Sequence, residues 1–402
     1  MAIDNKDKKV LKSSIEREQN ELACSAEREK IKGSKNLNVP HLRFPEFSGE
    51  WEEHTLSEYL EFKNGLNPDA KRIGSGLPFI SVMDILSEGV INYDNIRGKV
   101  NATEKEIECF GVKDGDLLFQ RSSETLEDVG RANVYMDNRT AIYGGFVIRG
   151  RKIGNYDPLF FKYLLATPLA RKRTCRMGAG AQHFNIGQEG LSKISLYFPS
   201  IEEQRKIAEF LSLIDERIAT QNKIIDKLKS LIKGIDEVVF QSCSKHCKLK
   251  EFDNQITAGR DKVEEGCFPL YGSTGVIGTT ATPSYHEPLV LVARVGSIGC
   301  VQFVNIPCGV SDNTIVIRCG SKAKYVYYYL QNYNFERITS GTTQPLITAK
   351  DVKHIDIPII DSANDLKAIN TLDTLNMKLE LESNLYNTIL KQKAFLLQQM
   401  FI

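Results

Sequence analysis

The longest regular pattern of apolar positions in the chain lies between residues 207 and 239. Apolar side chains recur there at alternating steps of four and three, and Gln221 occupies the one polar position in the series. This spacing is the a/d seam of a heptad repeat, which predicts a long helix that packs against another helix along one face. The members of this first seam are Ile207, Leu211, Ile214, Ile218, Gln221, Ile225, Leu228, Ile232, Ile235 and Val239.

A second seam with the same phase follows 161 residues later. Its first polar member, Glu382, corresponds to Gln221, and Phe401 corresponds to Phe240. Two long helices are therefore predicted one repeat apart. The members of the second seam are Ala368, Leu372, Leu375, Leu379, Glu382, Tyr386, Ile389, Lys393, Leu396 and Met400.

The repeat extends upstream of the helices with a steadily changing offset. The offset falls from 193 at Leu56 to 161 at the helices, so the second globular unit is 32 residues shorter than the first, with loops expected to absorb the difference. The chain is thus predicted to hold two colinear copies of a globular unit followed by a long helix. The matched pairs are Leu56 with Leu249, Arg121 with Arg294, Gly130 with Gly299, Val147 with Val316, Tyr163 with Tyr329, and Gly180 with Gly341.

Short apolar runs predict strands within each globular unit, with short helices between them. Asp157 and Pro158 open one predicted helix, because proline suits the first helical turn, and residues 324–330 form its counterpart. The tyrosines of this counterpart fit either a base-stacking platform or a packed apolar face, and their helical spacing favours the packed face. These are Tyr325, Tyr327, Tyr328 and Tyr329. The predicted strands are 116–119, 134–135, 146–149, 289–293, 301–304 and 314–318.

The composition indicates a globular protein of two or three domains. The 402 residues are 42% hydrophobic and 26% charged, and no apolar run approaches the roughly 20 residues that span a bilayer. The polar start of the chain lacks the apolar core of a secretory signal, and nine irregularly spaced cysteines suit free thiols in a reducing compartment, so a cytoplasmic location is expected. The net charge of +1 excludes a uniformly basic surface but leaves room for a local basic groove.

Catalytic motifs are absent from the sequence. It contains no GxxxxGK[ST] phosphate loop, no HExxH, no paired Cys-x-x-Cys framework and no Asn-Pro-Pro-aromatic tetrad. Cys243, His246 and Cys247 lack a second pair of metal ligands, and the glycines at 178 and 180 lack the third glycine of a dinucleotide-binding loop. A catalytic or metal centre is therefore not predicted.

Glycine-rich polar loops at matched positions carry the candidate chemistry. A cluster of cations between 171 and 176 leads into one such loop, where cations suit phosphates and amide side chains suit base edges. A lone arginine is more often a surface ion-pair residue, but the matched positions of Arg121 and Arg294 favour guanine reading. The predicted DNA contacts are Arg121, Ser122, Ser123, Arg171, Lys172, Arg173, Arg176, Gly180, Gln182, His183, Asn185, Arg294, Ser297, Thr342, Thr343 and Gln344.

Three segments resemble the DNA specificity subunits of type I restriction-modification systems. Segment 198–211, FPSIEEQRKIAEFL, resembles the start of the central conserved helix of that family, and segment 42–45, LRFP, with Trp51 resembles the usual start of the family pattern. Segment 271–278, YGSTGVIG, resembles a loop of the family's target recognition domains and adds Tyr271, Ser273 and Thr274 to the predicted DNA contacts. The second copy departs from the pattern at 359–365, IIDSAND, where the first copy has proline and Glu-Glu-Gln.

The resemblance implies an α+β protein with two α/β target recognition domains, each followed by a long helix, and the two helices packed as an antiparallel coiled coil. It implies that each domain reads one half of a bipartite sequence in double-stranded DNA. Methylation and cleavage then belong to partners, two methyltransferase (M) subunits and two restriction/translocase (R) subunits. S-adenosylmethionine, ATP and Mg²⁺ are used by those partners, and this chain is expected to need no cofactor and to be no enzyme.

The domain boundaries expected from the pattern follow the two copies. They are an arm at 1–38, disordered or helical, target recognition domains at 39–200 and 243–360, a central helix at 201–242 and a C-terminal helix at 361–402. About 35 helical residues give a spacer of roughly 50 Å between two DNA-reading domains. The alternatives are a free-standing enzyme, a coiled-coil scaffold, and a homodimeric DNA-binding protein without restriction partners. An enzyme should show one catalytic constellation in one place, and a scaffold would need no glycine-rich polar loops at matched positions.

Overall fold

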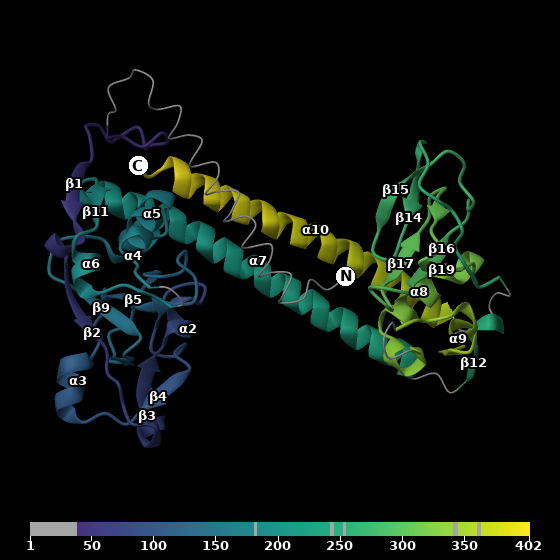
Figure 1. Ribbon diagram of the computed structural model, residues 1–402, viewed down its shortest axis with the longest axis horizontal. Coiled ribbons are helices and arrows are strands. Elements are labelled where there is room, and N and C mark those ends of the chain that lie inside the picture. Colours follow the sequence, from purple (N-terminus) through teal and green to yellow (C-terminus); the bar gives the residue numbers. More distant parts are fainter. Residues whose placement is uncertain (1–37, 181–182, 242–244, 252–254, 341–344, 360–362) are drawn as a thin grey trace. The chain divides into compact units, whose positions relative to one another are not determined.

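The computed structural model describes residues 38–180, 183–241, 245–251, 255–340, 345–359 and 363–402 (Figure 1). These residues form two compact units. Unit 1 comprises the chain up to Gln221 together with Leu385–Ile402, and unit 2 comprises Asn222–Asn384. Each unit holds a globular domain and parts of both long helices, α7 (Ile201–Gln241) and α10 (Ala363–Gln399).

Unit 1 is built on a four-stranded antiparallel sheet and a three-stranded mixed sheet. The first has the order β2 (Leu60–Asn64), β9 (Val147–Lys152), β5 (Leu117–Gln120), β7 (Ala132–Val134), and the second has the order β4 (Gly98–Val100), β3 (Ile73–Ile80), β8 (Ile142–Tyr143). Two strand pairs complete it, β1 (Glu52–Thr55) with β11 (Ser195–Phe198) and β6 (Ser122–Ser123) with β10 (Phe184–Asn185). Its helices are η1 (Leu56–Glu58), η2 (Ala70–Arg72), α2 (Val82–Ile85), α3 (Glu104–Phe110), α4 (Pro158–Leu165), α5 (Pro168–Arg176) and α6 (Gln188–Ser192).

Unit 2 repeats this plan with the same strand orders. Its four-stranded sheet runs β13 (Thr257–Ala258), β19 (Thr314–Ile317), β16 (Leu289–Ala293), β17 (Val301–Val304), and its three-stranded sheet runs β15 (Val276–Thr280), β14 (Phe268–Tyr271), β18 (Gly309–Val310). The pair β12 (His246–Lys248) with β20 (Asp356–Pro358) corresponds to β1 with β11. The helices are η3 (Leu249–Glu251), η4 (Gly320–Lys322), α8 (Ala323–Gln331), η5 (Phe335–Ile338) and α9 (Ala349–Lys353).

The predicted internal repeat holds down to single hydrogen bonds. The Leu56 N–H donates to the Ile194 carbonyl at 2.8 Å, and the Leu249 N–H donates to the Ile355 carbonyl at 2.9 Å. The prediction that loops absorb the extra length of unit 1 is only partly right. Unit 1 also contains the helices α2 and α3, which have no counterparts in the described residues of unit 2.

One predicted match, Val147 with Val316, is wrong by two residues. In the register of the sheets, Gln120 pairs with Val147, and Ala293, which precedes Arg294, pairs with Thr314. Val147 therefore corresponds to Thr314. A slip of two residues along a strand keeps every side chain on the same face of the sheet, so similar residues still align in the sequence. Strand β9 also begins at Val147, which leaves Phe146 outside the predicted strand 146–149.

Capping residues fix where the short helices begin. The Asp157 carboxylate accepts the Phe160 N–H at 2.9 Å, and Pro158 occupies the first turn of α4, as predicted. Thr167 and Pro168 begin α5 in the same way. The side chain of a tyrosine then joins each short helix to the long helix that follows it. Tyr163 donates to Asp215 of α7 at 2.9 Å, and Tyr328 donates to Asp373 of α10 at 2.9 Å.

Both long helices bury the predicted seams. All members of both seams are buried or half-buried. In unit 1, Ile207 and Leu211 of α7 share a core with Met400 and Phe401, which follow α10. In unit 2, Val239 at the end of α7 shares a core with Leu372 near the start of α10. The two helices therefore pair in antiparallel fashion within a single chain.

The tyrosines of α8 form a packed apolar face, which confirms this prediction over a base-stacking platform. Tyr325 and Tyr328 are buried in the core of unit 2, and Tyr327 and Tyr329 pack against that core. Phe240 of α7 lies against the rings of Tyr325 and Tyr329, with centroid distances of 5.6 and 5.5 Å.

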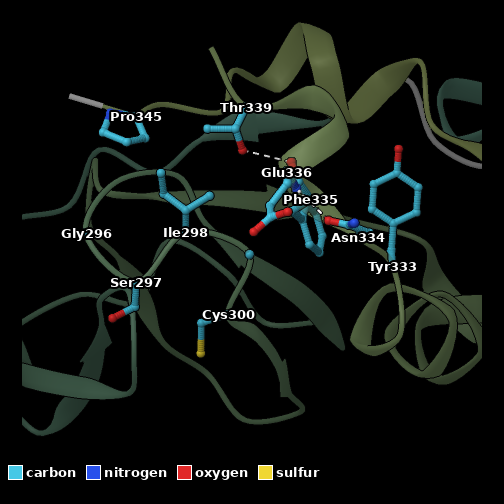
Figure 2. Close-up of a pocket in the computed structure, with 11 residues that line it drawn as sticks. Gly296, Ser297, Ile298, Cys300, Tyr333, Asn334, Phe335, Glu336, Thr339 and Pro345 are labelled. Atoms are coloured by element: carbon cyan, nitrogen blue, oxygen red, sulfur yellow. Dashed lines mark hydrogen bonds between the residues drawn. The ribbon is translucent and has the colours of Figure 1, made fainter. Parts of the chain in front are cut away.

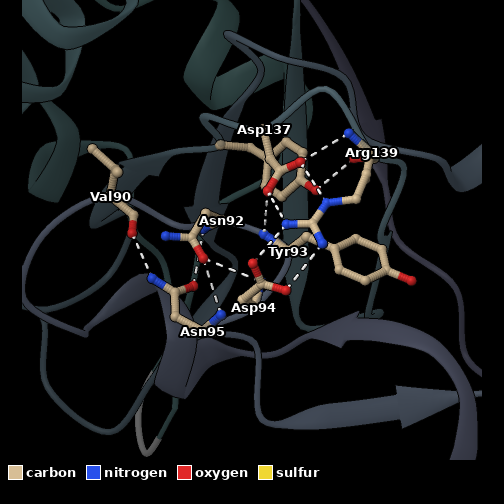
Figure 3. A network of polar contacts seen from close by, with 8 residues as sticks. Val90, Asn92, Tyr93, Asp94, Asn95, Asp137 and Arg139 are labelled. Atoms are coloured by element: carbon tan, nitrogen blue, oxygen red, sulfur yellow. Dashed lines mark hydrogen bonds and ion pairs between the residues drawn. The ribbon is translucent and has the colours of Figure 1, made fainter.

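An ion-pair network holds the connections around β8 in unit 1 (Figure 3). Arg139 donates to Asp94 at 2.7 Å and to Asp137 at 2.9 Å, and its guanidinium lies 4.3 Å from the centre of the Tyr93 ring. The guanidinium lowers the pKa of both carboxyl groups, because hydrogen bonds from a cation stabilise their charged forms. Segments 92–95 and 137–139 are thereby fixed to each other.

Candidate nucleic-acid interface

Arg121 lies immediately after β5 in unit 1 and is held by its backbone. Its N–H donates to the Phe146 carbonyl at 2.9 Å, and its carbonyl accepts the Ile186 N–H at 3.0 Å. Among the residues that the structure describes, the guanidinium makes one long hydrogen bond, 3.4 Å from Nη1 to the Gly145 carbonyl. A side chain whose backbone is held in place and whose N–H groups make only a long hydrogen bond suits contact with an external acceptor.

Arg294 occupies the same place in unit 2. Its N–H donates to the Asn313 carbonyl at 3.0 Å, and its carbonyl accepts the Ile347 N–H at 3.1 Å. Nη1 lies 3.4 Å from the Asp312 carbonyl, and Nε is buried without a hydrogen-bond partner among the residues that the structure describes. The predicted match of Arg121 with Arg294 thus reflects equivalent positions in two copies of one fold.

Four further predicted residues of unit 1 gather beside Arg121. Ser122 and Ser123 form β6, which pairs with Phe184 and Asn185 of β10. The Ser122 hydroxyl donates to the Asn185 side chain, whose Nδ2 donates to the His183 carbonyl at 3.2 Å. The sequence separates these segments by about 60 residues, and the strand pair brings them together.

Gly180 of this loop can only be glycine. Its φ of +142° lies in a region that L side chains rarely adopt, and an added Cβ would lie 2.0 Å from the His183 carbonyl oxygen. The backbone of Gly180 therefore lies in close contact with the backbone of His183. Gln182, next in the predicted site, lies outside the described residues, as do Thr342, Thr343 and Gln344 of the corresponding loop.

The basic side chains of α5 are of two kinds: some are bound to other groups of unit 1, and others are exposed. Arg171 donates to the carbonyls of Glu127 and Val129 at 2.8 and 2.6 Å, and burial lowers its pKa. Arg173 forms an ion pair with Glu53 at 2.8 Å and donates to Ser195. These two side chains hold α5 to the rest of unit 1, which the sequence could not show. Arg176 is exposed at the end of α5, and Lys172 is half-buried.

The predicted residues of unit 2 lie around Arg294. The Ser273 hydroxyl is 3.2 Å from the Val295 carbonyl and 3.3 Å from the Asn313 carbonyl, so the loop after β14 rests on the Arg294 segment. Thr274 is exposed, whereas Tyr271 packs against a core cluster. Ser297 lines a pocket between the loop after β16 and the segment around η5 (Figure 2). Tyr333, Phe335 and Thr339 line its other side.

We expect the substitutions Arg176→Ala and Arg171→Ala to separate the two kinds of cation. Loss of Arg176 should weaken binding to every DNA sequence alike and lower the slope of log affinity against log salt by about 0.9, because one phosphate contact is lost. Loss of Arg171 should lower the free energy of unfolding by about 1–3 kcal/mol, because the Glu127 and Val129 carbonyls lose their donor. Anisotropy with labelled duplexes across a salt series and urea unfolding measure the two effects. An unchanged salt slope for Arg176→Ala would remove this residue from the phosphate contacts.

A model of the type I restriction modification DNA specificity domain matches the chain twice, at residues 48–230 and 247–391. The chain belongs to this family of DNA specificity proteins. Each match covers one globular domain and part of the long helix that follows it. In the described part of the chain, no helix has the length and apolarity that a membrane span requires.

Individual relatives agree with this placement. The chain is 26% identical over 396 residues to the putative type I restriction enzyme MjaX specificity subunit of Methanocaldococcus jannaschii, covering 86% of this chain and 92% of that protein. It is 24% identical to the EcoKI specificity subunit of Escherichia coli over 49% of this chain and 41% of the relative. The crystal structure of a type I S subunit from M. genitalium has the same fold, with a TM-score of 0.66 over 90% of this chain and 99% of that one, at 19% identity.

Proposed function

We propose that this chain is the DNA sequence-recognition subunit of a type I restriction-modification complex. Each target recognition domain reads one half of a bipartite site in double-stranded DNA. The observation that carries this is the equivalence of Arg121 and Arg294, which two copies of one fold hold through the same backbone hydrogen bonds. Arginine can bind both acceptors of guanine in the major groove, so a duplicated arginine suits a target with two halves.

The chemistry is assigned to partners. An enzyme needs one constellation of activating groups, whereas this chain duplicates its polar loops. Two methyltransferase subunits, which use S-adenosylmethionine, methylate adenine at the site that this chain selects, and two restriction subunits use ATP and Mg²⁺ to cleave DNA. All of these proteins share the cytoplasm with their DNA substrate.

The alternative of a scaffold or homodimer that assembles through the long helices has less support. Within one chain, seam residues of α7 already share apolar cores with seam residues of α10, Leu211 with Met400 and Val239 with Leu372. Asp215 of α7 also forms an ion pair with the seam residue Lys393 at 2.5 Å. A homodimeric zipper would have to separate these helices first.

The decisive test is whether methyl transfer requires the partner. The purified chain with S-adenosylmethionine and DNA is expected to transfer no methyl group, whereas its complex with the cognate methyltransferase should methylate adenine at one bipartite sequence. Radiolabelled methyl incorporation and long-read sequencing of the DNA measure both outcomes. Methylation by the chain alone, with mass spectrometry showing no co-purified subunit, would overturn the assignment, and so would a complex that methylates without sequence preference.

A further inference from the structure

A tight turn precedes an inner strand of the four-stranded sheet in both units, β9 in unit 1 and β19 in unit 2. In unit 1, residues 144–147 join β8 to β9, and the Val147 N–H donates to the Gly144 carbonyl at 2.9 Å. In unit 2, residues 311–314 join β18 to β19, and the Thr314 N–H donates to the Ser311 carbonyl at 3.2 Å. The third residue is Phe146 in one turn and Asn313 in the other.

In each unit, a glycine at the equivalent position packs closely against the turn and fixes it. The Gly65 N–H donates to the Val147 carbonyl at 3.1 Å, and the Gly259 N–H donates to the Thr314 carbonyl at 2.9 Å. A Cβ added to Gly65 would lie 2.0 Å from the Gly144 carbonyl oxygen, and one added to Gly259 would lie 2.4 Å from that of Ser311. Backbone packed this closely presents the third residue of each turn in a defined position.

The backbone of that third residue is hydrogen-bonded to the backbone of the arginine in the candidate interface. The carbonyl of Phe146 accepts the Arg121 N–H, and the carbonyl of Asn313 accepts the Arg294 N–H. The Phe146 side chain is 67% exposed, and Asn313 is also exposed. Phe146 therefore gains little from burial in this chain, although a buried phenylalanine is among the strongest contributors to a core. Its position on a rigid turn beside Arg121 points to an external contact.

We propose that Phe146 stacks on or wedges between bases in the half-site read by unit 1, while Asn313 hydrogen-bonds a base at the corresponding place in the half-site read by unit 2. An aromatic ring beside a base-reading residue can stack on an exposed base face or enter a base step. A side-chain amide can bind both major-groove atoms of adenine. The inference rests on the proposed function and names the residues that make its two half-sites chemically different.

The test uses the complete complex with the methyltransferase and duplexes that carry the cognate site. Phe146→Ala should weaken binding roughly 5- to 150-fold and relax discrimination only in the half-site of unit 1. Phe146→Trp should keep most of the affinity, because it preserves stacking. Asn313→Ala should relax discrimination only in the other half-site. With 2-aminopurine placed along the unit 1 half-site, the fluorescence change on binding should be lost at one position in Phe146→Ala.

Ile153→Ala is the matched control. Ile153 is 60% exposed and directly follows β9 at the end away from the turn, so its truncation removes an exposed apolar side chain of unit 1 without touching the turn. If Phe146→Ala binds and discriminates like Ile153→Ala while the wild-type complex is specific, this inference fails and the proposed function stands. If the wild-type complex shows no sequence preference, the proposed function itself fails. If Phe146→Ala impairs assembly with the methyltransferase but leaves DNA binding by the assembled complex unchanged, Phe146 is a protein contact and the inference is overturned.

Discussion

Deleting one heptad from each long helix, residues 225–231 and 386–392, is expected to give a folded protein that no longer recognises its original split target. Seven residues preserve the a/d phase of both seams, so α7 and α10 can still pair. Each helix becomes shorter by about 10 Å. Along duplex DNA this corresponds to roughly three base pairs and about 100° of rotation, so both domains cannot engage the old half-sites together.

The methylation pattern in cells measures this result. The deleted protein should direct methylation, if any, to unchanged half-sequences with a shorter spacer. A deletion of five residues from α7 alone is the contrasting variant, because it breaks the seam and should lower the melting temperature. Methylation of the original target with its spacer intact would show that the helices do not set the separation of the half-sites.

Replacing Arg121 or Arg294 with alanine is expected to relax one half of the target and leave the other half unchanged. Loss of a bidentate contact to guanine should cost about 1–3 kcal/mol of discrimination at one base pair. Each arginine lies in its own unit, so the two effects should add in the double variant.

Competition binding with duplexes substituted at single positions measures the discrimination of each variant. Arg121→Lys and Arg294→Lys are the controls, because lysine keeps the charge but cannot form the planar bidentate contact. If these lysine variants discriminate like the wild type, the planar bidentate fork of arginine is not what reads the base at the two positions. If alanine variants weaken binding to all sequences equally, both arginines contact phosphates instead of bases.

The elements with regular periodicity could be predicted from the sequence. The heptad steps indicated both long helices and their buried faces, and continuous apolar runs indicated β16 and β17 with the bounds that the structure has. Such elements are predictable because burial of one face imposes a period on the sequence. The match of Arg121 with Arg294 also followed from the repeat alone.

The contacts that a side chain makes with distant segments could not be predicted from the spacing of residues in the sequence. The run of cations at 171–176 is typical of a phosphate-binding cluster, yet Arg171 and Arg173 donate to groups 22 to 120 residues away in the sequence. Phe146 adjoins an apolar run and reads as part of a strand, yet it lies in a turn and is exposed. In each case the side chain's role depends on which distant segment lies beside it, and local pattern does not carry that information.

The core of unit 1 has a consequence for how the chain is made. Trp51 packs against both Phe160 and Phe401, with centroid distances of 6.1 Å, and the Leu42 N–H donates to the Gln399 carbonyl at 2.8 Å. Domains usually fold in the order of their synthesis. Here the ribosome produces all of unit 2 before it produces the residues that complete unit 1. A nascent chain therefore holds its first domain with an open core until residues near 400 emerge, and a chain that stops within α10 leaves that aromatic core exposed to other chains.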